Sequence, residues 1–214
     1  MSRIESGKTT LNVEKMNLPQ QISQLDSIIR QQAGQRSQSF TVSTNLQHEN
    51  VLADPNRLNQ VLMNILSNAV KYTPTGGHIR FEVEELPRNE HYARYRFVVQ
   101  DDGIGMSEEF QKMMYSTFSR ATDSRINTIQ GSGLGLAIAK QMVELMHGTI
   151  ACQSEEGRRT TFVVNLELPE ADEKQAEERR EESGENEKSD SFVKTSGSLF
   201  GAKDGRIGTT EKMR

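Results

Sequence analysis

The sequence predicts an α+β domain built as a two-layer sandwich, with helices packed on one face of one sheet. Two observations carry this prediction. Strand-like segments occur as adjacent pairs, at 79–101 and again at 149–168, and amphipathic helical segments lie between the strands. A doubly wound parallel sheet would alternate each strand with a helix, so the adjacent pairs disfavour it.

The segment 53–72 shows the strongest helical pattern in the chain. Asp54 can cap the helix, Pro55 suits its first turn, and apolar residues then recur at helical spacing until "TPTGG" stops it. Weaker helical patterns predict the other helices, at 19–34, 108–115 and 133–147.

Alternation of apolar and polar residues predicts the strands. The first pair is joined by the polar "PRNEHYA" and the last pair by the turn "EEGRR". The predicted strands are 39–46, 78–86, 95–101, 148–154 and 160–168.

Composition divides the 214-residue chain into three parts. Residues 1–18 are polar and predict a linker, 19–169 form the folded domain, and 170–214 are rich in charge and predict a disordered tail, because so few apolar residues cannot offset the entropy of ordering. The single Cys152 excludes an intramolecular disulfide and a multi-cysteine zinc site.

Charge and hydropathy limit the partners. The formal net charge of -4 disfavours nucleic-acid binding, and the mean hydropathy of -0.68 comes without any apolar run long enough to span a membrane. We expect a reducing, cytoplasmic setting without membrane contact by this part, either alone or as the cytoplasmic part of a membrane-anchored sensor.

The stretch "NILSNAVKYTPTGG", residues 64–77, places polar side chains inside an otherwise buried helix. Asn64, Asn68 and Lys71 fall at i, i+4 and i+7, and therefore on one helical face. A polar stripe facing water would explain them, but Asn is a poor helix former. Amide oxygens can ligate Mg²⁺ and an ammonium can contact phosphate, so the stripe is a candidate site.

Two glycine-containing stretches are further candidates. In "VVQDDGIGMS" a strand delivers two carboxylates to its end, where one can accept a hydrogen bond from a ligand amine; an ordinary Asp-Gly turn is the alternative. In "QGSGLGLAIAKQMVELM" glycines precede and open a helix, whose N-terminus favours anions. No GK[ST] follows, so this is not a Walker motif.

Together, and in this order, the three stretches resemble the ATP-binding catalytic domain of sensor histidine kinases. The resemblance places the domain in the GHKL superfamily, whose members have the Bergerat fold and include gyrase-type topoisomerases, heat-shock chaperones of the ninety-kilodalton class and mismatch-repair ATPases. "NQVLMNILSNAVKYTPTGG" is similar to the N box, "DDGIGM" and "GSGLGL" to the two glycine boxes, "YSTFSRA" to the F box and "GRRTTFVVNLELP" to the last strand pair. The resemblance covers roughly 19–168 and implies a mixed sheet packed on three helices, with ATP held under a mobile lid at 116–132.

The resemblance also implies roles for single residues. Asp101 would accept the adenine amino group, with Thr161 as a second contact. Asn64 and Asn68 would lie at Mg²⁺, Lys71 would reach the phosphates, and Arg120 would contact the γ-phosphate during transfer. The other residues implied at the nucleotide are Tyr72, Gly103, Ile104, Gly105, Met106, Gly131, Ser132, Gly133, Leu134, Gly135 and Leu136.

Asn64 separates the branches of this superfamily. Hydrolysing members place a Glu there as general base, whereas Asn cannot take a proton at neutral pH. The resemblance therefore implies transfer of the γ-phosphoryl group to another nucleophile. Anti-sigma serine kinases are a close rival, but they lack the F-box stretch.

The phospho-acceptor histidine expected of such a kinase is missing from the sequence. His48, His78, His91 and His147 lack its usual surroundings, so they are interpreted as surface or strand residues. The chain thus reads as a kinase domain that acts on a histidine-bearing dimerisation domain from elsewhere, with a response-regulator receiver downstream. The alternative is a nucleotide-binding regulatory module without catalysis.

Overall fold

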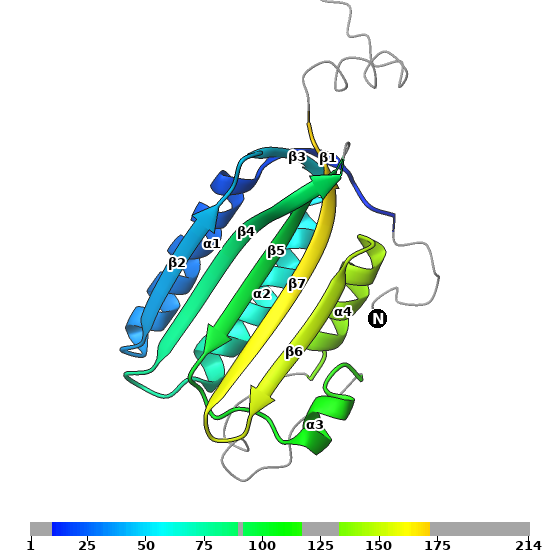
Figure 1. Ribbon diagram of the computed structural model, residues 1–214. Helices are drawn as coiled ribbons and strands as arrows, with labels where there is room; N and C mark the ends of the chain where they lie inside the picture. Colours follow the sequence, from blue (N-terminus) through cyan, green and yellow to red (C-terminus); the bar gives the residue numbers. More distant parts are fainter. Residues whose placement is uncertain (1–9, 90–91, 117–132, 172–214) are drawn as a thin grey trace, which may run out of the picture.

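The computed structural model describes residues 10–89, 92–116 and 133–171 as two layers, a sheet and a set of helices (Figure 1). The sheet has the strand order β2-β4-β5-β7-β6. Its strands are β2 (Ser39–Asn45), β4 (His78–Asn89), β5 (Tyr92–Asp101), β6 (Thr149–Glu155) and β7 (Arg159–Pro169). The β2–β4 pair is parallel and the other pairs are antiparallel, so the sheet is mixed.

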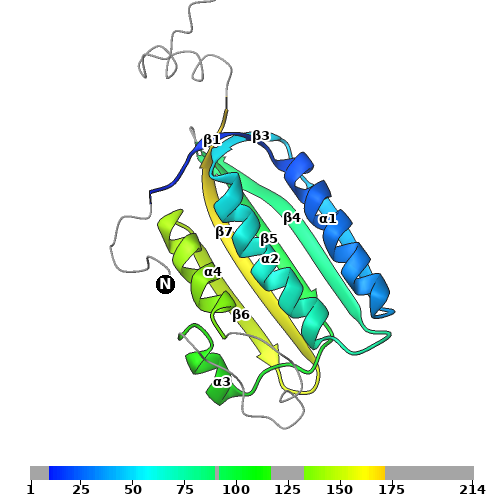
Figure 2. The same cartoon turned by 180° about the vertical axis from the view of Figure 1, so that it is seen from behind.

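Helices α1 (Leu18–Gln35), α2 (Pro55–Tyr72) and α4 (Gly135–Leu145) cover one face of the sheet (Figure 2). The short α3 (Glu108–Met113) lies beside the end of β6. The predicted α+β sandwich with a mixed sheet on three helices is therefore confirmed.

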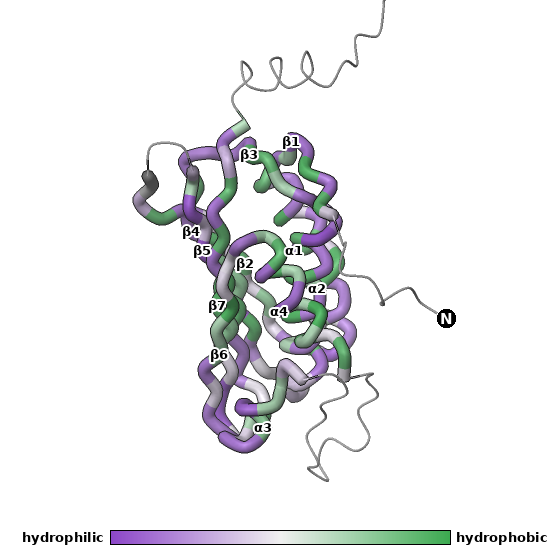
Figure 3. The backbone as a smooth tube through the Cα atoms, turned by 90° about the vertical axis from the view of Figure 1, so that its right-hand side faces the viewer, coloured by the Kyte–Doolittle hydropathy of each residue, from purple (hydrophilic) through white to green (hydrophobic). Residues whose placement is uncertain are grey.

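Helix α2 forms the middle of the helical layer because its sequence fits that position. Asp54 caps it by accepting a hydrogen bond from the Arg57 amide (3.0 Å), and Pro55 opens the first turn. Its apolar face is buried against the sheet. Figure 3 shows the sheet and the helical layer side by side, with hydrophobic segments in both. The buried residues of α2 are Leu58, Val61, Leu62, Ile65, Leu66, Ala69 and Val70.

Two short strands were not predicted from the sequence. β1 (Glu14–Asn17) lies within the segment predicted as a linker and pairs antiparallel with β3 (Asn50–Ala53). Four residues are too few to show a period, so the pairing between distant segments decides their conformation. The remaining predicted elements are present, with bounds shifted by a few residues or, for β4 and β5, with longer strands.

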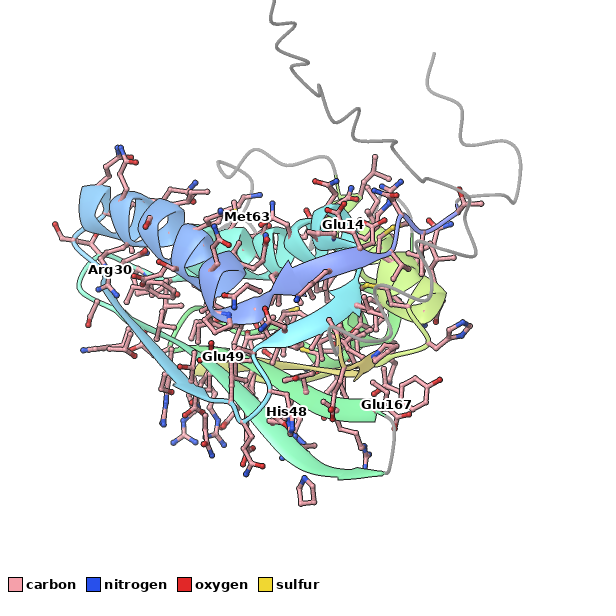
Figure 4. The ribbon with its side chains drawn as sticks, turned by 90° about the horizontal axis from the view of Figure 1, so that it is seen from above. Glu14, Arg30, His48, Glu49, Met63 and Glu167 are labelled. Carbon is pink, nitrogen blue, oxygen red and sulfur yellow. The ribbon has the colours of Figure 1, made fainter. Side chains whose placement is uncertain are left out.

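At the end of the sheet beside β1 and β3, which we call the anchored end, polar groups form hydrogen bonds with one another. Asp54 also accepts a hydrogen bond from the Asn12 amide (2.9 Å). The buried Glu85 carboxylate accepts from the amides of Gln47 (2.7 Å) and His48 (2.8 Å), and its Oε1 lies 2.6 Å from Nδ1 of His48. Tyr95 donates to the His48 carbonyl (2.7 Å). Figure 4, seen from above, labels His48 and Glu49 in the connection to β3 and Glu14 on β1.

No helix in the described ranges is both long and apolar enough to cross a membrane. The predicted tail beyond residue 171 lies outside those ranges.

Candidate nucleotide-binding site

Asp101 is the buried carboxylate at the opposite end of the sheet, where β5 ends. Its side chain faces the helical layer and the residue is only 5% exposed. Burial raises the pKa of Asp101 to about 7; the amide of Gly103, which donates to Oδ1 (3.0 Å), opposes the rise, and the nearby Asp102 charge adds to it. A buried carboxyl group with a pKa raised toward neutrality is typical of a functional site.

Asp102, the next residue, points to the other side of the sheet and is exposed. It accepts from the His78 amide (2.6 Å), and its Oδ2 lies 2.9 Å from Nδ1 of His78. Partial burial raises the pKa of Asp102, but the hydrogen bonds from His78 outweigh it and leave the pKa below its usual value. Of the two adjacent carboxylates, only Asp101 faces the helical layer.

The turn Gly103–Met106 lies between α2 and the β6–β7 hairpin. On one side the Ile104 amide donates to the Tyr72 carbonyl (3.2 Å). On the other side Gly157 donates to the Ile104 carbonyl (2.7 Å), and Gly105, at a φ of 64°, packs against the Glu155 backbone. A Cβ at Gly103 would lie 2.7 Å from the Tyr72 carbonyl oxygen, so both positions require glycine.

The polar stripe predicted on α2 is half-buried, and its first residue, Asn64, lies beside the start of α4. Asn64, Asn68, Lys71 and Tyr72 are all partly exposed, and Lys71 Nζ lies 4.9 Å from the centre of the Tyr72 ring. The Asn64 amide oxygen lies 3.4 Å from the position that a Cβ on Gly135 would occupy. The structure therefore brings the first asparagine of the predicted N box to the start of the helix that follows the second glycine box.

Helix α4 begins at Gly135, and no side chain in the described part of the chain caps it. Gly133 has a φ of 70°, which favours glycine, and Leu134 and Leu136 are partly buried beside it. Arg120, Gly131 and Ser132, together with nearly all of the predicted lid, lie outside the described residues.

Thr161 does not share the face of the sheet on which Asp101 lies. Thr160 is the strand partner of Asp101 and is buried on the same face, whereas Thr161 pairs with Gln100 and points to the opposite face. Strand alternation explains the difference: the inward-facing Phe162 requires Thr160 to face inward and Thr161 outward. The sequence pattern therefore contained the signal that would have selected Thr160.

The residues present fit an adenine nucleotide at this end. The Asp101 carboxyl can accept from an exocyclic amine, the glycines let a ligand approach the backbone, and the polar face of α2 supplies an ammonium and amide oxygens. The amides of Asn64 and Asn68 are hard oxygen donors of the kind that Mg²⁺ takes. Among the described residues, His, Cys, Asp and Glu form no group of three or more that could hold a metal ion.

Comparisons with known proteins agree with this geometry. Residues 53–170, more than half of the chain, match the family described as histidine kinase-, DNA gyrase B-, and HSP90-like ATPase. The autoinducer 2 sensor kinase/phosphatase LuxQ of Vibrio vulnificus is 34% identical over 167 residues, covering 77% of this chain and 19% of LuxQ. The sensor histidine kinase WalK of Bacillus subtilis is 39% identical over 120 residues, covering 56% of this chain and 19% of WalK.

A solved structure supports the fold. Full-length ShkA in complex with AMPPNP superposes with a TM-score of 0.64 at 23% identity, covering 78% of this chain and 33% of ShkA. The chain thus spans about a fifth of the length of LuxQ and of WalK. The family model, which matches more than half of the chain, shows that this chain belongs to the histidine kinase-, DNA gyrase B-, and HSP90-like ATPases, and the relatives named above are sensor kinases.

Proposed function

We infer that this domain binds Mg-ATP and transfers the γ-phosphoryl group to a histidine on a dimerisation domain, for two-component signal transduction. The observation that carries the proposal is Asp101, a carboxyl group buried on the helical side of the sheet and flanked by a turn that requires glycine. Membership of the family supports adenine as the base that this carboxyl recognises.

At the adenine end, Asp101 accepts a hydrogen bond from the base amine. Ile104 and Met106 line the pocket beside it, while Gly103 and Gly105 let the base approach the backbone. Thr160, which shares the buried face with Asp101, takes the second polar contact that the sequence had assigned to Thr161.

At the phosphate end, the polar face of α2 meets the start of α4. Lys71 contacts phosphate, Tyr72 flanks the base or ribose, and Asn64 and Asn68 hold the metal ion. When bound, Mg²⁺ offsets the negative charge of the phosphates. Arg120, Gly131, Ser132, Gly133, Leu134, Gly135 and Leu136 complete this end in the proposal.

Asn64 directs the chemistry away from hydrolysis. An amide cannot remove a proton from water at neutral pH, so no general base acts at this position. The nucleophile is then supplied by the imidazole of the acceptor histidine, which is already unprotonated in its neutral form.

The proposed partners follow from this reaction. They are a histidine-bearing dimerisation domain and the receiver domain of a response regulator. The catalytic unit is the predicted domain 19–169 together with β1 (Glu14–Asn17), which pairs with β3, and the remainder of the predicted tail 170–214 has no assigned role. The setting is cytoplasmic, and no nucleic acid is involved.

Transfer of labelled phosphate tests the proposal. The chain is incubated with γ-labelled ATP, Mg²⁺ and a separately produced dimerisation domain, and we expect acid-labile, base-stable label on that domain. Asn64→Ala should abolish the label, whereas Asn59→Ala, the same change on another face of α2, should preserve it. Nucleotide binding without transfer to any cognate acceptor would contradict the proposal and favour a non-catalytic regulatory module.

A further inference from the structure

The β6–β7 hairpin holds the glycine turn from outside the predicted motifs. Ser154, near the end of β6, lies at the centre of this contact. Its hydroxyl accepts from the Met106 amide (2.8 Å), lies 2.9 Å from the Arg159 carbonyl oxygen, to which it can donate, and lies 3.0 Å from the Thr160 hydroxyl. One side chain thus contacts both the turn and the neighbour of Asp101.

Gln111 on α3 completes the contact from the other side. Its amide group donates to the Met106 carbonyl (2.9 Å) and to the Ser154 carbonyl (3.1 Å). The amide and the carbonyl of Met106 are therefore both held by side chains, one from β6 and one from α3. Neither side chain belongs to the N box or to a glycine box.

The hydroxyl of Ser154 also restricts the hydrogen bonding of the Thr160 hydroxyl. A hydroxyl has one proton and two acceptor sites. When Ser154 donates to the Arg159 carbonyl and accepts from Met106, its remaining acceptor site takes the Thr160 proton. The oxygen of Thr160, on the same face as Asp101, is then left as a hydrogen-bond acceptor.

We propose that Ser154, assisted by Gln111, is a positioning residue that sets the adenine specificity of this site. It fixes the Gly103–Met106 turn at the distance that suits the base, and it fixes the hydrogen-bonding state of Thr160 beside Asp101. Two acceptors side by side, Asp101 and Thr160, favour a base that presents an amine and disfavour one that presents a carbonyl at the same place. This inference rests on the proposed function.

Calorimetric titration of the full chain with ADP and with IDP tests the inference, because hypoxanthine carries a carbonyl where adenine carries the amine. For Ser154→Ala we expect ADP affinity to fall roughly fivefold to twentyfold and IDP affinity to fall much less, so that the preference for ADP shrinks. General weakening of the fold would lower the affinities for ADP and IDP by the same factor. Ser154→Thr, which keeps the hydroxyl, should restore both the affinity and the preference.

Thr149→Val is the matched control. It removes another side-chain hydrogen bond between β6 and β7, the one from Asn165 (3.2 Å), at the far end of the hairpin strands, and should change neither affinity. Gln111→Met should reproduce part of the Ser154→Ala effect without adding to it in the double variant.

Two results overturn the inference in distinguishable ways. If the unaltered chain binds no ADP, the proposed function fails and the inference falls with it. If the unaltered chain binds ADP and Ser154→Ala keeps the same affinity and the same preference, the inference alone is wrong.

Discussion

The two ends of the sheet treat their polar groups differently. At the anchored end, the carboxylates of Asp54 and Glu85 have both oxygens engaged by backbone amides or by His48. At the glycine end, which we define by Asp101 and the turn 103–106, the buried carboxyl accepts from the Gly103 amide at one oxygen. Satisfied polar groups hold the chain together, whereas a buried acceptor with remaining capacity lowers stability and suits a ligand.

The largest expected effect comes from filling the glycine end. Gly105→Ala places a Cβ against the Glu155 carbonyl oxygen and forces alanine to a φ of 64°, so we expect roughly 3 kcal/mol or more of destabilisation and more than tenfold weaker ADP binding. Urea unfolding and calorimetry measure the two effects.

Gly157→Ala is the control for Gly105→Ala. It has a similar φ of 78° but no atom within 4 Å of the added Cβ, so it should lose only about 1–2 kcal/mol and little affinity. Equal effects of the two substitutions would show that the close contact of the turn with the hairpin is unimportant.

Breaking the anchored end should lower stability without touching the ligand. Glu85→Ala leaves the amides of Gln47 and His48 without their acceptor, and we expect a loss of roughly 2 kcal/mol, measured as a fall in Tm of several degrees. ADP affinity at a temperature where the variant is folded should stay unchanged. Glu84→Ala, on the exposed face of the same strand, should have little effect on stability or affinity. A large loss of ADP affinity in Glu85→Ala would show that the anchored end and the glycine end do not have separate roles.

Removing the charge at the glycine end should stabilise the domain, in a pH-dependent way. The pKa of Asp101 is about 7 in the folded chain against an ordinary value of 3.8, so folding favours the protonated carboxyl. The stabilisation that results is complete below about pH 4 and is lost as the pH rises through 7. Asp101→Asn should therefore gain roughly 1–2 kcal/mol over the unaltered chain at pH 8 and almost nothing near pH 4. Urea unfolding across this range measures the difference, and a gain independent of pH would contradict the assignment of the charge.

The sequence predicted the fold well where periodicity is long. The stripe of apolar residues on α2, its Asp54 cap and the paired strands β4–β5 and β6–β7 all follow from local patterns that tertiary packing reinforces. Strands β1 and β3 could not be predicted this way, because four residues carry no measurable period and only their mutual pairing gives them structure.

The candidate site was predicted in part. The motifs led to Asp101, the glycine turn and the polar face of α2, which the structure places at one end of the sheet. The resemblance implies Thr161 as the second contact, whereas the alternation around Phe162 places Thr160 on the face of Asp101. Ser154 could not be found from the sequence, because its contact with the Met106 amide joins residues 48 apart in the chain. Gln111 lies close to Met106 in the chain, but its second contact, with the Ser154 carbonyl, joins residues 43 apart.

Calorimetric titration with ADP of the unaltered chain, Asp101→Asn and Asp102→Asn tests the central claim most directly. The two carboxylates are adjacent in sequence, and only Asp101 faces the helical layer. We expect Asp101→Asn to weaken ADP binding about tenfold to a hundredfold, because an acceptor of a charge-assisted hydrogen bond is lost, and Asp102→Asn to stay within about twofold. Unchanged affinity in Asp101→Asn, or an equal loss in both variants, would contradict the assignment of adenine to Asp101.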